Sequence, residues 1–331
     1  MPAEWERHEA TWLAWPKDPL TFPSGVIEKV EVAYAKIIGS LARGERVDLL
    51  VDDQSTEVRV RRLLESTSNV VFHRIKTADV WIRDYGPIFV RNSDVAAIKW
   101  RFNAWGNKYE ELLPDDRSGL DVALSTGLRL FEPGFVLEGG SIDVNGMGAC
   151  LLTEQCLLNR NRNPHLSRTQ IEGILRDYLG VTNPVWLGRG VVGDDTDGHV
   201  DDVARFTSER SVLCVTEPDR SDENYQALAE NLQLLSKARD QDGRMLELTK
   251  VPMPRKKVGG VDRLPATYAN FYIGNATVLV PTFGDENDSK ALSTIAGLFP
   301  TRQTIGVDCE ALVYGFGGIH CVTQQQPSAG L

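Results

Sequence analysis

Hydrophobic residues recur at helical spacing in several stretches of the chain. Between Val26 and Leu41, apolar side chains return every three or four residues, which predicts an amphipathic helix. The same spacing predicts helices over residues 56–65 and 222–235. Each helix would pack its apolar face against a sheet.

Two further helices are predicted from the signals at their ends. Ser167 with Gln170 three residues later forms a capping box, and Gly180 marks the end of that helix. Asp288 is an N-cap candidate for a helix that stops before Pro300.

Short strands with turn signals lie between the predicted helices. Asn145-Gly146 interrupts the apolar stretch 141–153, and Gly274-Asn275 interrupts 270–281, so each stretch predicts a hairpin. Residues 79–92 and 210–218 are further strand candidates. Strands and helices therefore alternate, which indicates a mixed α/β chain.

No linker or low-complexity segment divides the sequence. We therefore expect residues 1–331 to form a single domain built from repeated sheet-and-helix units. The most polar stretch, 239–265, predicts a surface loop.

The charge and cysteine content narrow the class of partner and the compartment. With 46 acidic against 36 basic residues, the net charge of -10 argues against a nucleic-acid or anionic membrane partner and favours a cationic one. The five cysteines lack the spacing of a disulfide framework and suit free thiols. The first residues do not resemble a secretory signal, and no stretch approaches the roughly 20 apolar residues of a membrane span. We expect a cytoplasmic protein.

Cys321 lies in an unusual context, GFGGIHCVTQQQP over residues 315–327. Glycines precede it and glutamines follow it, whereas a packed core cysteine normally has apolar neighbours. A nucleophilic cysteine needs a base or a low pKa. His320 is a poor partner, because adjacent side chains on an extended chain point to opposite sides. His199 is the better candidate.

The stretch TDGHVDDVARF, residues 196–206, supplies this histidine together with a carboxylate. Strand-like spacing would place His199 and Asp201 on one face, although a surface turn is the alternative because aspartate and glycine favour turns.

Two more carboxylates stand beside glycines. Asp84 precedes Gly86-Pro87 and is either a functional residue or an ion-pair partner of Arg83. Glu138 follows an apolar run and precedes two glycines, where it is either held by backbone N–H groups or directed at a ligand.

Together these residues suit a planar cation better than a metal. No second cysteine or His-x-x-x-His pair accompanies them, so we do not expect a metal site. Paired carboxylates can bind a guanidinium group bidentately while a thiolate attacks its central carbon.

Seven segments, in order along essentially the whole chain, resemble the agmatine deiminases of the bacterial peptidylarginine-deiminase-like branch of the guanidine-modifying superfamily. These are PAEWERHEATWLAWP, VWIRDYGP, LEGGSIDVNG, LLNRNRNP, DTDGHVDDVARF, YANFYIGNATVLVPTFGD and IHCVTQQQP. The resemblance implies the pentein fold, a five-bladed propeller of ββαβ units with pseudo-fivefold symmetry.

The resemblance also implies a reaction that needs no metal or organic cofactor, and it implies roles for individual residues. Asp84 and Asp201 would bind the guanidinium, Cys321 would attack it, and His199 would protonate the departing ammonia and activate water. The remaining matched positions are Glu138 beside His199 or the substrate, Asn270 orienting a neighbour or substrate nitrogen, and Trp81 along the aliphatic chain or simply in the core.

Two positions depart from the family pattern, and the substrate stays open. Gly315-Phe316-Gly317-Gly318 replaces the usual GGGN, and Asp195 stands where a glutamate is common. Asp195 would bind the free amine of agmatine, whereas Arg160 or Arg162 would bind the carboxylate of free or carboxyl-terminal peptidyl arginine. A non-catalytic guanidine- or polyamine-binding protein and a metal-dependent amidohydrolase are further alternatives. A homo-oligomer is compatible with the sequence.

Overall fold

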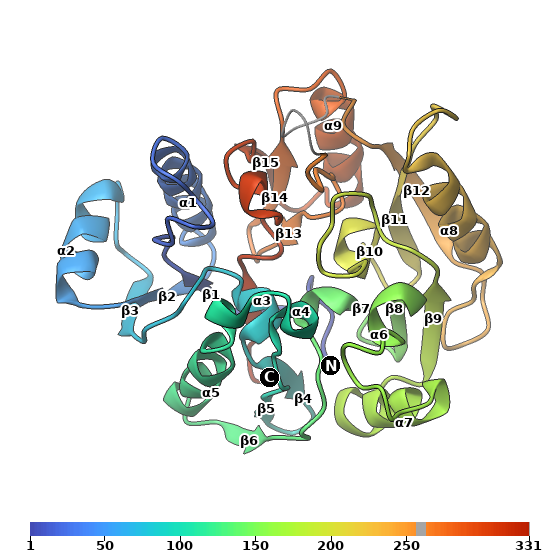
Figure 1. The fold of residues 1–331 in the computed structure, drawn as a ribbon, viewed down its shortest axis with the longest axis horizontal. Helices are drawn as coiled ribbons and strands as arrows, with labels where there is room; N and C mark the ends of the chain where they lie inside the picture. The colour runs from blue at the N-terminus through green and yellow to red at the C-terminus, as the bar shows by residue number, and fades with distance from the viewer. Residues whose placement is uncertain (256–262, 331) are drawn as a thin grey trace.

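Five small sheets contain the named strands of the described residues, 1–255 and 263–330, in this computed structural model (Figure 1). One sheet has four strands in the order β16-β1-β2-β3, and the other four sheets have three strands each. Helices connect the strands, so the chain is mixed α/β, as the sequence predicts.

The strands follow the chain in order except that β16 joins the first sheet. They are β1 His8–Ala14, β2 Arg46–Val51, β3 Val70–Arg74, β4 Ile88–Arg91, β5 Val95–Ile98, β6 Arg129–Phe131, β7 Ile142–Val144, β8 Ala149–Thr153, β9 Asn183–Leu187, β10 Ala204–Phe206, β11 Ser211–Thr216, β12 Glu247–Pro252, β13 Tyr272–Ile273, β14 Thr277–Thr282, β15 Gln303–Asp308 and β16 Gln324–Pro327.

The helices include several very short ones near the middle of the molecule. The α-helices are α1 Ile27–Leu41, α2 Gln54–Leu63, α3 Ile82–Tyr85, α4 Ala104–Asn107, α5 Asp115–Ser125, α6 Glu154–Leu157, α7 Arg168–Leu179, α8 Tyr225–Lys237 and α9 Asp288–Leu298. The 3₁₀ turns are η1 Glu110–Leu112, η2 Gly139–Ser141, η3 Val200–Asp202 and η4 Val313–Gly315.

The sheets share one connectivity. In each three-stranded sheet the first two strands are antiparallel, a helix follows, and the third strand runs parallel to the second. The first sheet repeats this pattern with β16 antiparallel to β1 and β2 parallel to β1 after α1, and then adds α2 and β3. Segments from opposite ends of the chain therefore complete one sheet, with Trp12 opposite Gln324.

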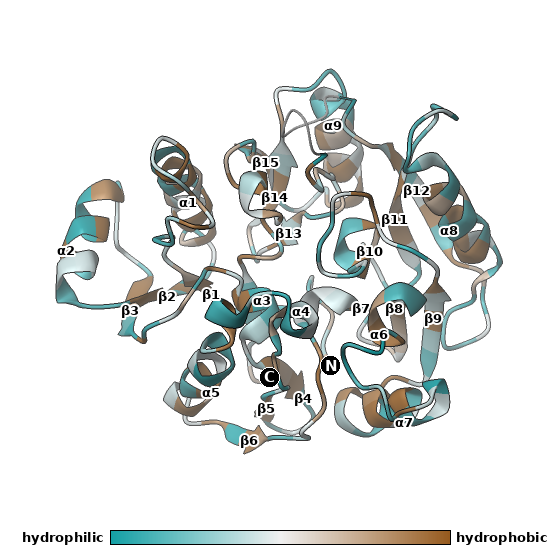
Figure 2. Cartoon of the chain, viewed as in Figure 1, coloured by the Kyte–Doolittle hydropathy of each residue, from teal (hydrophilic) through white to brown (hydrophobic). Residues whose placement is uncertain are grey.

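Apolar side chains pack between the sheets and their helices. Figure 2 shows hydrophobic residues on strands such as β2 and β11, while α1 and α8 carry both hydrophobic and hydrophilic residues. In β2, Val47 and Leu49 are fully buried, and in α1, Tyr34, Ile37 and Ile38 are fully buried. No helix in the described part of the chain is long and apolar enough to cross a bilayer.

The five predicted helices are present with shifted ends. Helices α1, α2 and α8 correspond to the predictions at 26–41, 56–65 and 222–235. The capping box at Ser167 is formed, and Gly180 adopts a left-handed conformation (φ 73°), as expected for a helix end. For α9 the N-cap is Asn287 rather than Asp288, because the Asp288 carboxylate accepts hydrogen bonds from the backbone of Phe283 and Asp285.

Helix α5 has no counterpart among the predictions. Its internal Gly119 weakens the sequence signal, and the structure gives a reason for the glycine. A Cβ atom at this position would lie 1.9 Å from the carbonyl oxygen of Tyr85. The glycine thus lets α5 approach α3 closely.

The strand predictions are confirmed at both hairpins and at 210–218, which contains β11. Within 79–92 only β4 is a strand, because residues 82–85 form α3 instead. The polar stretch 239–265 contains β12, and its residues 256–262 lie outside the described residues.

Candidate active site

A cavity of about 400 Å³ opens beside Cys321. Five acidic residues line it, and the described residues of its lining include no lysine or arginine. The acidic residues are Asp18, Asp79, Asp84, Glu111 and Asp195, and the aromatic ones are Trp81, Trp105, Tyr109, Tyr314 and Phe316. The cavity is therefore suited to a ligand with positive charge and an apolar part.

Each of the five sheets contributes to this region from the segment just before one of its outer strands. Asp84 precedes β4, Glu138 precedes β7, His199 and Asp201 precede β10, Asn270 precedes β13, and Cys321 precedes β16. The repeated connectivity thus brings chemically different side chains together from five distant parts of the sequence.

Cys321 lies in a turn and is only 8 % exposed. Its Sγ atom is 3.2 Å from Asn270 Nδ2 and 3.9 Å from Asp201 Oδ2. Burial raises the pKa of the Cys321 thiol well above its usual value, and the carboxylates of Asp201, Asp202 and Asp84 add to the effect. Without a bound cation, the thiol is therefore protonated near neutral pH.

The glycines before Cys321 make room for protein side chains. A Cβ atom at Gly317 would lie 2.3 Å from the Trp81 ring, and one at Gly318 would lie 2.4 Å from Asn270 Oδ1. Their small size thus lets Trp81 and Asn270 approach the turn that holds the thiol.

Asp84 is buried at the cavity and is not an ion-pair partner of Arg83. Its Oδ2 accepts from Trp105 Nε1 at 3.0 Å and its Oδ1 from the backbone N–H of Gly140 at 3.0 Å. Burial raises the pKa of Asp84 to about 6, although His199 opposes the shift. Arg83 instead donates to Gln325, Glu4 and the backbone oxygen of His320.

His199 lies between two carboxylates. Its Nδ1 is 3.8 Å from Asp84 Oδ1 and its Nε2 is 3.9 Å from Glu138 Oε2. Burial alone would lower the pKa of His199, but Asp84 and neighbouring groups raise it well above its usual value. His199 is therefore an imidazolium that can donate a proton.

Glu138 is held by a side chain and not by backbone N–H groups. Its Oε1 accepts from Arg162 Nε at 2.6 Å. Arg162 also donates to Asp197 Oδ2 at 2.8 Å and to the Thr196 backbone oxygen at 2.8 Å. This buried arginine therefore neutralises Glu138 and has its donors directed at the protein.

The prediction that His199 and Asp201 share a strand face is wrong. Residues 200–202 form the 3₁₀ turn η3, and the strand begins only at Ala204. The two side chains nevertheless lie close together, beside Gly140. A Cβ atom built on Gly140 would lie 2.5 Å from His199 Nδ1, 3.0 Å from Asp201 Oδ2 and 3.0 Å from Asp84 Oδ1. Three groups converge where Gly140 has no side chain.

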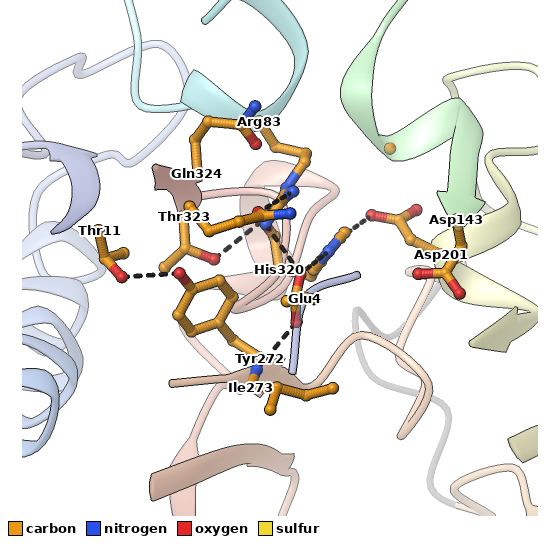
Figure 3. A network of polar contacts seen from close by, with 12 residues as sticks. Glu4, Thr11, Arg83, Asp143, Asp201, Tyr272, Ile273, His320, Thr323 and Gln324 are labelled. Carbon is orange, nitrogen blue, oxygen red and sulfur yellow. Dashed lines mark hydrogen bonds and ion pairs between the residues drawn. The ribbon is translucent and has the colours of Figure 1, made fainter. Parts of the chain in front are cut away.

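Asp201 is fully buried and belongs to the network of Figure 3. Its Oδ2 accepts from His320 Nδ1 at 2.7 Å, while Oδ1 has no hydrogen-bond partner in the described structure. Burial opposes ionisation, but His320 holds the pKa of Asp201 below its usual value. Asp201 is therefore a carboxylate with one oxygen that takes part in no hydrogen bond among the described residues.

The sequence signal missed His320 and Glu4, which join this network. His320 lies in a turn rather than an extended segment, so the argument from alternating side chains did not apply. Its Nε2 contacts Glu4 Oε2 at 2.8 Å, more than 300 residues away in the sequence. The segment PAEWERHEATWLAWP contains Glu4, but nothing in it indicates this contact.

Asp195 and Trp81 both line the cavity. Asp195 Oδ2 accepts from Tyr109 Oη at 2.5 Å, and burial raises the pKa of Asp195. Trp81 donates its Nε1–H to Asp79 Oδ2 at 2.8 Å, which fixes its ring at the wall. Phe316, one of the departures from the family pattern, is 41 % exposed on the same cavity.

One group of side chains resembles a metal-ligand set. Ligand atoms of Glu138, Cys156 and His199 lie within 4.8 Å of one another and are buried. Arg162 already binds one oxygen of Glu138, and burial raises the pKa of the Cys156 thiol, so this set favours protons over a cation. All five cysteines are buried free thiols, as predicted.

Comparison with known proteins identifies the family. The profile of the Porphyromonas-type peptidyl-arginine deiminases matches residues 1–327. The chain belongs to this deiminase family. The agmatine deiminase of Pseudomonas aeruginosa is 37% identical over 353 residues, covering 99% of this chain and 95% of that protein.

Solved structures of deiminases agree with the family assignment. The agmatine deiminase of Enterococcus faecalis has a TM-score of 0.92 and 34% identity, covering 100% of this chain and 96% of that one. A C. jejuni agmatine deiminase with substrate bound has a TM-score of 0.89 and 32% identity, covering 99% and 96%.

Gly140 gives a test of the convergence of Asp84, Asp201 and His199. We expect Gly140→Ala to displace these groups and to lower kcat/KM by about 100-fold, because misplacement by about 1 Å has that effect. Gly297→Ala in α9 is the matched control, because the Cβ position there is open. Steady-state kinetics gives kcat/KM for both variants, and thermal unfolding shows whether each variant is folded. Equal activity of both would contradict the convergence.

Proposed function

We propose that this protein is an agmatine deiminase, which hydrolyses agmatine to N-carbamoylputrescine and ammonia. The observation that carries the proposal is a cavity with five acidic side chains and a buried cysteine, with no lysine or arginine among the described lining residues. Agmatine carries a cation at each end, so such a cavity favours it over a substrate with a carboxylate. The names of the relatives agree with this choice.

The proposed mechanism is covalent. The guanidinium lies between Asp84 and Asp201, and its charge offsets the carboxylates that keep Cys321 protonated. The thiol releases its proton to solvent, and the thiolate bonds to Cζ. His199 gives a proton to a Cζ-bound nitrogen, the Cζ–N bond breaks, and the nitrogen leaves as ammonia.

The second half of the reaction restores the thiol. His199, now neutral, takes a proton from water, and the water oxygen bonds to Cζ of the thiouronium. The carbon–sulfur bond then breaks and returns its electron pair to Cys321, and the hydroxyl proton of the adduct passes to the sulfur, which leaves a ureido product and the thiol. Glu138 supports His199, and Asn270, which is 3.2 Å from the sulfur, orients the thiolate. No metal or organic cofactor takes part.

The far end of the cavity supports agmatine over arginine. We propose that Asp195 binds the free amine and that Trp81 packs along the methylene chain. Arg160 is exposed and absent from the described lining, and Arg162 is bound to Glu138 and Asp197. Neither arginine is therefore placed to bind a substrate carboxylate.

Wider assignments belong to the same proposal. The shared ββαβ connectivity and the matching site positions before β4, β7, β10, β13 and β16 support a single domain, residues 1–331, arranged as a five-bladed pentein propeller with pseudo-fivefold symmetry (Figure 1). We also propose a cytoplasmic homo-oligomer that acts in putrescine formation.

A comparison of substrates tests the proposal. Ammonia and ureido product are measured with agmatine, free arginine and a peptide with carboxyl-terminal arginine, with Cys321→Ala as the control. We expect preference for agmatine, activity that is insensitive to EDTA, and no turnover by Cys321→Ala, which still binds the guanidinium. Preference for arginine would overturn the substrate assignment. The absence of ammonia release from all three substrates would favour a guanidine-binding protein. Loss of activity with EDTA would favour a metal-dependent amidohydrolase.

Asp195 can be tested with a substrate that lacks the amine. In pentylguanidine a methyl group replaces the ammonium group of agmatine. We expect Asp195→Asn to lower kcat/KM about tenfold for agmatine, as for the loss of one charged contact, and to leave pentylguanidine unchanged. Equal losses for both compounds would show that Asp195 does not bind the amine.

Thiol alkylation tests whether a cation activates Cys321. At pH 7 we expect cationic 2-chloroacetamidine to alkylate Cys321 at least about tenfold faster than neutral 2-chloroacetamide, because the cation offsets the carboxylates that raise the thiol pKa. The preference should fade as pH drops through about 6, where Asp84 gains a proton and loses its charge. Asp84→Asn should weaken it. Mass spectrometry gives the rates, and equal rates for both reagents would contradict the activation.

A further inference from the structure

Glu4 joins segments that are far apart in the sequence. Its side chain is buried, and Oε1 accepts from Arg205 Nη2 at 2.9 Å and from the backbone N–H of Ile273 at 2.9 Å. Oε2 accepts from Arg83 Nη2 at 3.3 Å and contacts His320 Nε2 at 2.8 Å. Figure 3 shows Glu4 close to His320 and Ile273 in this network.

His320 lies between Glu4 and Asp201, with a carboxylate oxygen at each ring nitrogen. The two contacts are 2.8 Å at Nε2 and 2.7 Å at Nδ1. A neutral imidazole has one N–H and would turn a lone pair toward one of the carboxylates. The doubly protonated ring can donate one N–H group to each carboxylate.

Other charged groups surround this contact. Arg83 donates to the His320 backbone oxygen, and Arg205 pairs with Asp143 at 2.7 Å as well as with Glu4. Asp201 also interacts with the imidazolium of His199 and with the buried carboxyl groups of Asp84 and Asp202. Of these groups, His320 is the one that contacts both Asp201 and Glu4.

The contact with His320 also decides which oxygen of Asp201 is available. Oδ2 accepts from His320, and Oδ1 has no partner among the described residues. Rotation of the carboxylate would break the bond to the imidazolium. The ring thus holds the free oxygen in one position and keeps the carboxylate ionised.

We propose that Glu4 is a positioning residue for deimination, acting through His320 to hold Asp201 ionised with Oδ1 free to receive the guanidinium. The inference rests on the function proposed above. It makes a side chain near residue 1 part of the machinery that serves a nucleophile at residue 321.

A second buried pair provides a matched control. His8 Nδ1 contacts Glu45 Oε1 at 3.1 Å, and both side chains are buried. Glu45 also accepts from the backbone N–H of Asn275. This pair resembles Glu4 with His320 in chemistry and burial, but within the described residues neither side chain of the pair is hydrogen-bonded to Asp201 or Cys321.

The experiment compares Glu4→Gln with Glu45→Gln in the full chain. Glutamine retains the shape of Glu4 without its charge, so His320 loses the partner that favours its second proton, and the pKa of Asp201 should rise. We expect the part of the acid limb of kcat/KM for agmatine that reports on Asp201 to move about one pH unit higher, so that kcat/KM falls about tenfold on that part of the limb and little at pH 7. Activity should recover toward the wild-type value at higher pH. Glu45→Gln should keep the wild-type profile.

His320→Asn provides a second variant if Glu4→Gln does not fold. Asparagine Nδ2 can still donate to Asp201, but the link to Glu4 and the positive charge are lost, so the same shift of the acid limb is expected. A fall in kcat/KM with no shift in pH profile for the folded variants would overturn the proposal, since a purely structural role gives that result. Thermal unfolding identifies the folded variants.

Alkylation by 2-chloroacetamidine separates this inference from the proposed reaction. If the wild-type protein turns over none of the substrates, the proposed function fails, but the alkylation rate of Cys321 still reports on the cation site. Slower alkylation of Glu4→Gln, with Glu45→Gln unchanged, would support the positioning role. Equal rates for both variants would overturn it.

Discussion

Burial of several carboxylates around one point is the constraint on which the site depends. Glu138 has Arg162 and Asp201 has His320 as close cationic partners, whereas Asp84 has only hydrogen-bond donors and His199 at 3.8 Å. A buried negative charge is costly unless a cation is near. Asp84 therefore lacks a close cationic partner among the described residues, and a guanidinium could supply one. Burial without such a partner raises the pKa of Asp84 to about 6.

The same excess of buried negative charge affects the ionisation of Cys321. Carboxylates next to Cys321 oppose its ionisation, so the free protein presents an unreactive thiol. In the proposed mechanism, a bound cation offsets this field at the place where attack occurs. Recognition and activation are then two effects of one charge, and a buried cysteine would react selectively with cationic substrates.

The sequence predicted what depends on local patterns. The capping box at Ser167, the glycine at its helix end and the two hairpins all depend on neighbours a few residues away, and the structure contains them. Helix α5 was missed because Gly119 meets a requirement of packing against Tyr85, which is distant in the sequence.

The site was predictable as a set of residues but not as a geometry. Resemblance to known motifs selected Asp84, Glu138, His199, Asp201 and Cys321, which the fold brings to one region. The 3₁₀ turn at 200–202 and the turn at His320 depend on tertiary contacts, so reasoning from strand periodicity failed at both. Glu4 carried no signal, because its partners Arg205 and His320 lie about 200 and 316 residues further along the chain.

Pairing of β1 with β16 has a consequence for biosynthesis. While the ribosome is still making the chain, β1 has no β16 beside it, and the segment with Cys321 does not yet exist. Glu4 emerges early but can contact His320 only after more than 300 further residues have been translated. The first sheet, and with it the proposed site, can therefore be completed only when β16 has been made and pairs with β1.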